Sequence, residues 1–237
     1  MLALVVDTAT AAVTVGIVEY SDQAYTVRSE HIVVDAKRHG ETLAPSIAAA
    51  FSSASVRAED LGAIVAGVGP GPFTGLRVGL VTAASLSDAL GIPAYPVCSL
   101  DGLAEPGRPL LVATDARRRE VYWAIYDADG VRVTGPDVAK PADLQARLTT
   151  ERSEPSEPSE SAERSAPDEL TAVGSGAALY AEQLGLPTGE PLYPTVAGLA
   201  RRATDRVLGK APSEPLTPLY LRRPDAVEPG TAKSVLT

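Results

Sequence analysis

The most informative stretch of this sequence is Gly69-Pro70-Gly71-Pro72-Phe73-Thr74-Gly75-Leu76-Arg77-Val78-Gly79. The apolar run Ala63–Val68 precedes it and predicts a buried strand. The Ala-rich stretch that follows predicts a helix to Leu90, closed by Gly91, with Thr74 as its N-cap. A strand therefore passes into a helix at this loop. Such a turn directs free backbone N–H groups beyond the strand end, toward an anion or another protein.

The loop also has a purely structural explanation, because glycines at a strand-to-helix corner often serve close packing. A Walker-type phosphate loop is excluded, since Leu76 and Arg77 stand where that motif requires Lys followed by Ser or Thr. The dinucleotide-binding fingerprint fails on its glycine spacing. The loop is specific in sequence but matches neither generic nucleotide motif.

Length and composition indicate a globular protein. The 237 residues suffice for one large domain or two small ones, and the apolar content of 45% is ordinary. The single cysteine, Cys98, excludes an intramolecular disulfide and favours a reducing compartment; we interpret it as a buried structural thiol. The chain start lacks a signal-peptide pattern and no apolar run approaches about 18 residues, so we expect a cytoplasmic protein.

The net charge of −9 argues against broad, unaided binding to nucleic acid. The acidity is uneven, because residues 151–169 hold seven acids and two arginines and contribute −5, which leaves −4 elsewhere. The Ser/Glu/Pro tract 149–168 has no apolar period, and we expect it to be a disordered surface insertion. The rest of the chain can still carry a local basic patch.

The first part of the chain predicts the order β-β-β-α-β-α, a mixed sheet flanked by helices. Its first helix is His39–Phe51, and because proline suits the first turn of a helix, the regular part is expected to begin close to Pro45. Its strands are Leu2–Val6, Val13–Glu19, Tyr25–Val34 and Ala63–Val68.

After Asp101 the pattern starts again, with strands Leu110–Asp115 and Glu120–Tyr126 joined by the turn Ala116–Arg119. This repeat favours a duplicated plan of two subdomains. We expect a first subdomain at 1–103 and a second at 104–195, in which regular structure resumes after the Ser/Glu/Pro tract with a strand at 170–173. A helix at 196–208 is expected to pack back on the first subdomain. The remaining residues, 209–237, are expected to form a tail with an ordered stretch at 218–222.

Metal and covalent chemistry find little support in the sequence. His31 and His39 are the two histidines, and Leu43 occupies the position where a helical metal pair would need a histidine four residues after His39. No Gly-x-Ser-x-Gly nucleophile elbow is present, although a serine triad built from distant residues stays open. We therefore expect no metal ligand and no catalytic residue.

Two polar turns are candidates for anion binding. Asp7, Thr8 and Thr10 lie in the turn after the first strand, where a carboxylate and hydroxyls can hold the metal-bound water and phosphate of a magnesium nucleotide. The alternative is a turn whose side chains cap their own backbone. Thr74 is a fourth candidate contact. The turn Arg117-Arg118-Arg119 either binds RNA or a phosphate, or is basic for solubility alone.

Five parts of the sequence together resemble the bacterial TsaB (YeaZ) family. The resemblance covers nearly the whole chain outside the Ser/Glu/Pro tract, in the expected order, and residues 69–79 are its most specific part. The family more often has Ser at the position of Pro72, and the tract is a second departure. The matching segments are Leu2–Thr10, His39–Pro45, Gly69–Gly79, Asp115–Arg117 with Glu120–Trp123, and Pro218–Arg222.

The resemblance implies an α/β protein with the duplicated actin/hexokinase-like (ASKHA) fold, in which each of two subdomains is a mixed β-sheet flanked by helices. It implies a role in forming N6-threonylcarbamoyladenosine beside the anticodon of tRNAs. Family members there are non-catalytic partners of the paralogue TsaD, which carries the metal histidines and transfers the threonylcarbamoyl group, while TsaE supplies ATPase activity. Leu43 in place of a second histidine fits this division of labour.

The resemblance also implies an interface. The helices His39–Phe51 and Thr74–Leu90 would form a four-helix bundle with the same helices of TsaD or, without it, of a second copy in a homodimer. tRNA would be reached through the complex, with no membrane involved. No intrinsic cofactor is expected, but ATP or ADP with magnesium would bind near this interface. The expected interface residues are His39, Leu43, Ile47, Ala50, Phe73, Arg77, Val78, Val81 and Ala84.

Two other classes of function stay open. An independent ATPase or sugar-kinase-like enzyme of the same superfamily would use Asp7 and Asp115, but the turn after Asp115 lacks the Gly-rich, Thr-bearing sequence that such kinases normally have. A metalloprotease is suggested by the older glycoprotease label of the paralogues, and Leu43 in place of a histidine argues against it.

Overall fold

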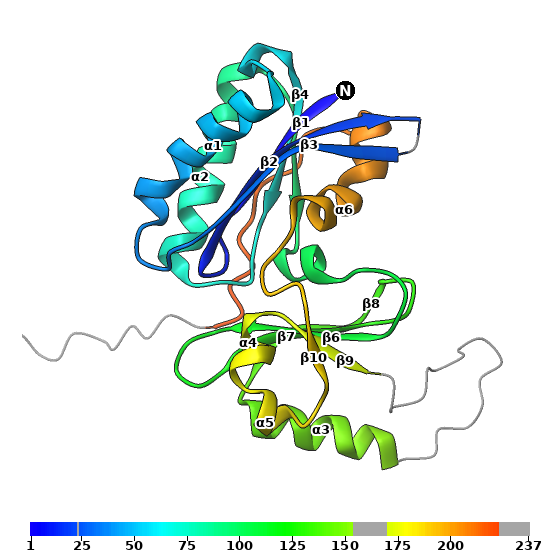
Figure 1. Cartoon of the computed structure of the whole chain (residues 1–237). Coiled ribbons are helices and arrows are strands. Elements are labelled where there is room, and N and C mark those ends of the chain that lie inside the picture. Colours follow the sequence, from blue (N-terminus) through cyan, green and yellow to red (C-terminus); the bar gives the residue numbers. More distant parts are fainter. Residues whose placement is uncertain (23, 154–169, 223–237) are drawn as a thin grey trace, which may run out of the picture.

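Two five-stranded mixed sheets form the protein (Figure 1), in a computed structural model that describes residues 1–22, 24–153 and 170–222. The first sheet has the order β3-β2-β1-β4-β5, and the second has the corresponding order β8-β7-β6-β9-β10. The strands are β1 (Leu2–Asp7), β2 (Ala12–Ser21), β3 (Ala24–Val34), β4 (Leu61–Gly67), β5 (Ala94–Val97), β6 (Leu110–Asp115), β7 (Val121–Tyr126), β8 (Arg132–Ala139), β9 (Thr171–Val173) and β10 (Thr188–Gly189).

The strand directions show that the two sheets repeat one plan. In each, the first three strands form an antiparallel meander, and the fourth strand lies parallel to the first and to the fifth. The predicted duplicated α/β plan is therefore confirmed at the level of topology.

Helices cover both faces of the first sheet (Figure 1). The helices α1 (His39–Ala54) and α2 (Phe73–Leu90) pack on one face, and α6 (Val196–Leu208) packs on the other. Strand alternation decides which side chain meets which helix. In β1, Leu4 and Val6 belong to the cluster with α1, while Ala3 and Val5 belong to the cluster with α6.

The second sheet is covered in the same way. One face packs against α3 (Pro141–Ser153) and the short helices α4 (Ser175–Leu179) and α5 (Ala181–Leu184), and the other packs against the 3-10 helix η2 (Ser99–Leu103). A second 3-10 helix, η1 (Ala58–Asp60), precedes β4. No helix in the described ranges is long and apolar enough to cross a membrane.

Helix α6 and the segment after it connect the two halves. Gly198 of α6 lies so close to η2 that an added Cβ would come within 2.1 Å of the Gly102 carbonyl oxygen. Residues 213–222, which we call the return segment, run back beside α2. The Leu219 N–H donates to the Val68 carbonyl at 2.8 Å, and Arg222 forms an ion pair with Glu120 at the start of the second sheet's β7.

Three sequence predictions need correction. Helix α1 begins at His39, six residues before Pro45, and Pro45 is tolerated inside the helix because it lies on the exposed side. Helix α2 begins at Phe73 with Pro72 at the N-cap, so Thr74 is not the cap. Residues 149–153 belong to α3, while 154–168 lie outside the described residues.

The predicted boundaries at residues 103 and 195 stay predictions. The first sheet ends at Val97, the second extends from Leu110 to Gly189, and α6 packs on the first sheet. Of the predicted tail 209–237, the structure describes residues up to 222.

Candidate functional site

Three turns meet where the parallel strands of the first sheet end. Asp7 ends β1, the loop Gly69–Pro72 follows β4, and Ser99 follows β5. Because parallel strands place their carboxyl ends at one edge of a sheet, these turns become neighbours, and this edge is where open α/β sheets usually bind ligands. The Gly69 N–H donates to the Ser99 hydroxyl at 3.0 Å, and the Ser99 N–H donates to the Gly69 carbonyl at 2.7 Å.

Asp7 is buried in this junction. The Ala9 N–H donates to its Oδ1 at 2.9 Å, and the Ser99 hydroxyl donates to its Oδ2. An added Cβ on Gly67 would overlap the same carboxylate, so Asp7 is also packed beneath β4. Burial raises the pKa of Asp7 above its ordinary value of 3.8, against the opposing effect of the hydrogen bonds from Ser99 and Ala9. Both carboxylate oxygens therefore serve the fold.

We expect Asp7→Asn to stabilise the protein near neutral pH. A raised pKa in the folded state means that the stability linked to Asp7 is fully present below about pH 3.8 and is lost as the pH rises through the raised pKa. An amide cannot ionise, and it keeps an acceptor for Ala9 and a donor for Ser99. Thermal unfolding from pH 4 to pH 8 should show a Tm advantage of D7N that grows with pH. Asp35→Asn is the control, because the Arg38 guanidinium lowers the pKa of exposed Asp35. A lower Tm of D7N at pH 7.5 would contradict the prediction.

The other hydroxyls of this turn are also used within the chain. The Thr8 hydroxyl donates to the Gly75 carbonyl at 2.7 Å and accepts the Gly79 N–H at 3.0 Å. Thr8 thereby fastens α2 to the end of β1, and Gly79 permits the contact because a Cβ there would lie 2.4 Å from the Thr8 hydroxyl. The Thr10 hydroxyl accepts the Ala12 N–H at 3.2 Å, and its carbonyl accepts His39 Nε2 at 2.8 Å.

A small pocket of about 230 Å³ opens beside this junction. It brings together Thr10 and Thr74 of the predicted anion contacts, whereas Asp7 and Thr8 lie outside it. Ligand pockets for organic molecules usually measure about 300–1,000 Å³. Asp7 and Thr8 are committed to internal hydrogen bonds and lie outside the pocket, so in this arrangement they offer no free group to a nucleotide. The predicted nucleotide or anion contacts at these four residues stay a prediction. The pocket lining also includes Lys37, His39, Phe73, Val78 and Arg117.

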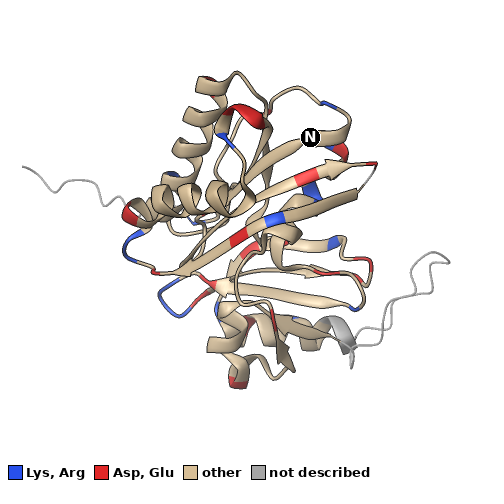
Figure 2. Cartoon of the chain, turned by 45° about the horizontal axis from the view of Figure 1, so that its top comes forward, with Lys and Arg blue, Asp and Glu red and all other residues tan. Residues whose placement is uncertain are grey.

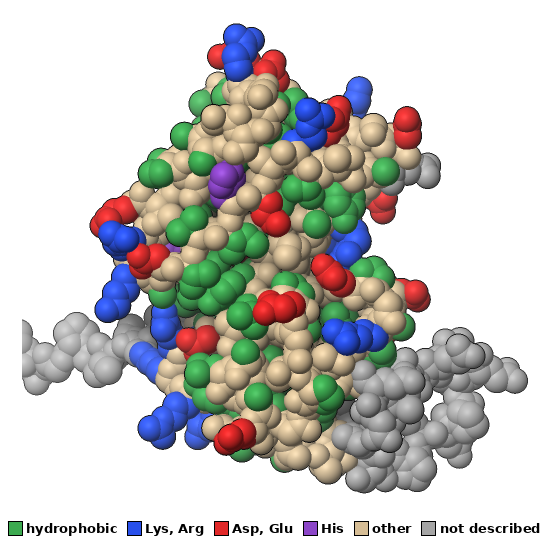
Figure 3. Space-filling model, viewed as in Figure 1, with side chains coloured by type: hydrophobic (Ala, Val, Ile, Leu, Met, Phe, Trp, Pro, Cys, Tyr) green, Lys and Arg blue, Asp and Glu red, His purple; other side chains and the backbone are tan. Residues whose placement is uncertain are grey.

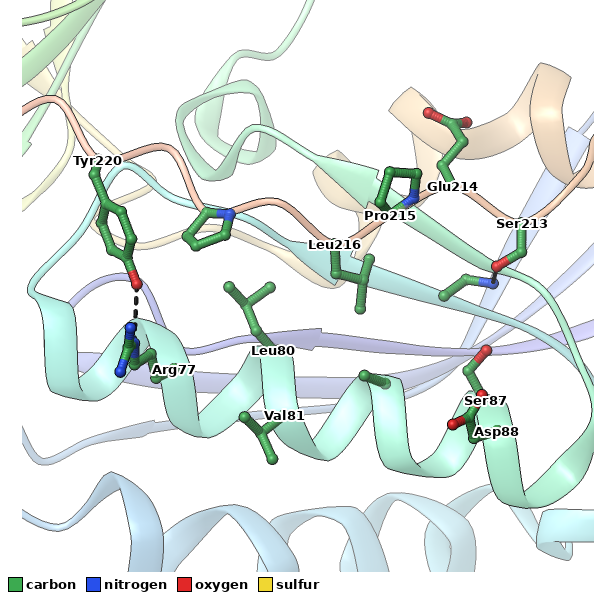
Figure 4. A pocket seen from close by; sticks show the side chains of 13 residues that line it. Arg77, Leu80, Val81, Ser87, Asp88, Ser213, Glu214, Pro215, Leu216 and Tyr220 are labelled. Carbon is green, nitrogen blue, oxygen red and sulfur yellow. Dashed lines mark hydrogen bonds between the residues drawn. The ribbon is translucent and has the colours of Figure 1, made fainter.

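A larger groove, of about 530 Å³, separates α2 from the return segment (Figure 4). Leu80 and Leu216 face one another across it, and the Arg77 guanidinium donates to the Tyr220 hydroxyl at 3.0 Å at one end. The Phe73 ring stacks on Tyr220 with centroids 5.3 Å apart, and the Arg77 guanidinium lies 3.9 Å from the Phe73 centroid.

One side of α2 stays largely exposed, although Tyr220 of the return segment contacts Phe73 and Arg77 at one end of it. Its members recur every three or four residues and therefore share one helix face. Val81 at the centre of this face is 64% exposed, and Phe73 at one end is 51% exposed. We call this face the α2 stripe: Phe73, Arg77, Val81, Ala84 and Asp88, all exposed.

The structure divides the predicted interface residues into two groups. Phe73, Arg77, Val81 and Ala84 lie on the α2 stripe. His39, Leu43 and Ala50 are buried, and Ile47 and Val78 are half-buried. Leu43 and Ala50 belong to the core between α1 and the first sheet, so their side chains are not available to a partner here. Their apolar helical spacing signals this core.

Sequence reasoning missed the other wall of the groove. Ser213, Pro215, Leu216 and Tyr220 line it, together with Asp88 of α2. The sequence predicted that Pro218–Arg222 is ordered, but nothing in the sequence places this stretch beside α2.

Other predicted sites have ordinary surroundings. Burial raises the pKa of the Cys98 thiol to about 12, which matches a buried structural thiol. Asp115 accepts the Arg117 N–H at 2.9 Å and pairs with its guanidinium at 3.6 Å. Within the described ranges, no group of three or more His, Cys, Asp or Glu side chains is placed to hold a metal ion.

The repeated sheet plan places the molecule in the actin/hexokinase-like class of duplicated α/β folds. A solved structure from Pseudomonas aeruginosa, described as an uncharacterized protein with similarity to peptidase YeaZ, matches with a TM-score of 0.71 and 25% identity over 93% of this chain and 99% of that one. A family model described as "TsaD: tRNA N6-adenosine threonylcarbamoyltransferase" matches residues 29–213.

Sequence relatives agree with this placement. An uncharacterized protein of Mycobacterium tuberculosis is 45% identical over 94% of this chain and 92% of its own length, and a Mycobacterium leprae relative is 46% identical over 95% of this chain but only 56% of its own length. The tRNA threonylcarbamoyladenosine biosynthesis protein TsaB of Bacillus subtilis is 36% identical over 43% of this chain and 46% of that protein. The chain belongs to the TsaB (YeaZ) family, within the wider family that the matching model describes.

Proposed function

We propose that this chain is a non-catalytic partner and activator of a TsaD-type transferase in forming N6-threonylcarbamoyladenosine on tRNA. The names of its relatives support the pathway, since several are TsaB proteins of threonylcarbamoyladenosine biosynthesis. The observation that carries the partner role is the α2 stripe, whose apolar centre at Val81 is 64% exposed. Exposed apolar faces rimmed by charge mark protein interaction sites.

The junction at Asp7 supports a non-catalytic role. In a related enzyme, such a turn would present its carboxylate and hydroxyls to a ligand. Here Asp7 binds Ser99 and Ala9, and Thr8 binds two glycines of α2, so the polar groups hold the interface helix in place. No step of the proposed function runs through a nucleotide or a metal held by this chain.

The partner that fits this face is a related helix pair. A paralogue with the same fold presents corresponding helices, so a pseudo-symmetric contact between α1, α2 and the partner's equivalents would bury both faces. We propose a heterodimer with TsaD in the cytoplasm, joined by TsaE, and a homodimer when the chain is alone.

Reconstitution tests the proposed function. Purified TsaD, TsaE and threonylcarbamoyl-AMP are incubated with an unmodified tRNA transcript, with and without this chain, and the modified nucleoside is quantified after digestion. We expect product only in the complete mixture. Equal product in both mixtures would refute the activator role. Product in a mixture without TsaD would instead support the rival hypothesis, an independent enzyme.

A further inference from the structure

Basic side chains from two separate loops meet at the rim of the small pocket. Lys37 comes from the loop before α1, and Arg117 comes from the turn between β6 and β7; both line the pocket. Arg118 and Arg119 continue the turn, and all three arginines are exposed. In Figure 2 the two loops lie on the same side of the molecule, and Figure 3 shows Lys and Arg side chains along the corresponding edge.

The conformation of the β6–β7 turn is unusual for arginine. Arg117, Arg118 and Arg119 have φ values of +61°, +54° and +62°, three successive residues in the left-handed region. Glycine adopts this region without steric conflict, and Asn and Asp tolerate it, so these are the residues such turns normally carry. A turn needed only for chain reversal would therefore be more stable with glycine. Residues in strained backbone conformations cluster at functional sites. This turn keeps arginine at three strained positions, so it presents three guanidinium groups where glycine would be less strained.

The acidic groups facing this rim neutralise it only in part. Asp35 pairs with Arg38 at 2.9 Å, and Asp115 pairs with Arg117 at 3.6 Å. No carboxylate in the described ranges pairs with Lys37 or Arg119. The charges of Lys37 and Arg119 are thus left for an external anion. Arg117 lies beside them, and its charge is partly neutralised by Asp115.

The start of α2 adds to the attraction for an anion. Phe73, Thr74 and Gly75 form the first turn of this 18-residue helix and line the same pocket. The first N–H groups of a helix have no intrahelical acceptor and carry partial positive charge. Cationic side chains and this helix end thus converge on one small pocket.

We propose that Lys37, Arg117 and Arg119, which we call the basic rim, bind backbone phosphates of the tRNA while this chain is paired with its transferase. The inference rests on the proposed function, which supplies the tRNA. A free nucleotide fits the site less well, because the pocket of about 230 Å³ is smaller than usual ligand pockets. Of the three cations, Lys37 and Arg117 line the pocket, while Arg119 is exposed on the same turn as Arg117. Since the whole chain carries −9, the rim contributes within the complex rather than as an independent RNA-binding surface.

The test measures tRNA affinity of the complex as a function of salt. Fluorescence anisotropy uses a labelled unmodified tRNA transcript, with the chain in complex with TsaD, and compares Lys37→Gln/Arg117→Gln/Arg119→Gln with the wild type. The slope of log K against log salt should fall by about 0.7–0.9 for each phosphate that the variant no longer neutralises, and affinity should weaken about tenfold or more at low salt. The matched control, Arg28→Gln/Arg57→Gln/Arg108→Gln, removes the same charge from exposed positions elsewhere and should leave the slope unchanged.

Two further arms separate the explanations. Arg119→Gly removes the backbone strain of a non-glycine residue in the left-handed region, so the Tm of this variant should rise by a few degrees. Its tRNA affinity should fall all the same, which would exclude unfolding as the cause of the loss. A titration with ATP should show the same weak response in wild type and rim variant. Wild-type tRNA affinity and salt slope in the rim variant would overturn the proposal, as would equal losses in rim variant and control. The proposed function does not depend on either of these outcomes. It stands as long as the wild-type complex modifies tRNA.

Discussion

Val81→Glu should abolish stable pairing with the transferase while leaving the chain folded. Val81 is 64% exposed at the centre of the α2 stripe, so a carboxylate there is solvated in the free chain and should change its stability by no more than about 0.5 kcal/mol. In a complex, the same carboxylate would be buried without a partner, at a cost of about 3 kcal/mol or more. That corresponds to an affinity loss of about a hundredfold.

The measurement is co-purification with tagged TsaD, followed by titration calorimetry. Val133→Glu is the matched control, because Val133 is 59% exposed on β8, in the other subdomain. We expect V133E to bind as the wild type does and V81E to lose binding, with both melting near the wild-type temperature. Normal binding by V81E would show that the interface lies elsewhere on the chain.

Much of the fold could be predicted from the sequence because hydrophobic period and turn chemistry agree over its main elements. Helix α6 was predicted with the observed bounds Val196–Leu208, and the β6 strand with the bounds Leu110–Asp115. The end of α2 followed from Gly91, which takes the left-handed conformation with φ of +64°.

The elements that were missed lack such signals. The strand β5 has only four residues and contains Pro96, and β8 contains Gly135 and Pro136 in its middle. Both residues are unfavourable inside strands, so propensity argues against the observed structure. Tertiary pairing determines these strands, since β5 lies parallel to β4 and β8 lies antiparallel to β7.

The candidate site shows a second limit of sequence reasoning. Hydroxyls and a carboxylate at Asp7, Thr8 and Thr10 suit either a ligand or the chain's own backbone, and the sequence does not say which. The decision depends on Ser99 and on Gly75 and Gly79 of α2, which lie far away in the chain and come close only through the sheet. The same limit applies to Leu43. Its place in the apolar spacing of α1 indicates a buried helix face, but the sequence does not say whether that face belongs to a core or to an interface.

Gly71→Ala should destabilise the protein severely, although it adds a single methyl group. A Cβ on Gly71 would lie 2.1 Å from the Ala9 carbonyl oxygen and 2.8 Å from its Cα, so it would meet backbone rather than a flexible side chain. The loop cannot easily withdraw, because Thr8 holds the first turns of α2 by two hydrogen bonds and Ser99 holds Gly69 by two more. Overpacking of this kind costs about 3 kcal/mol, which lowers Tm by about 6–12 °C in a chain of this size.

Thermal unfolding of Gly71→Ala and Gly40→Ala tests this reasoning with identical chemical changes. Gly40 lies in α1, and an added Cβ there meets nothing within 4 Å, so its Tm should stay the same or rise slightly because alanine favours the helix. A Tm of G71A within about 2 °C of the wild type would show that the β4–α2 loop is free to shift away from Ala9. In that case the loop would not fix the direction of α2. The α2 stripe would then lack the rigid support of a preformed interface, because ordering a mobile helix on binding costs affinity.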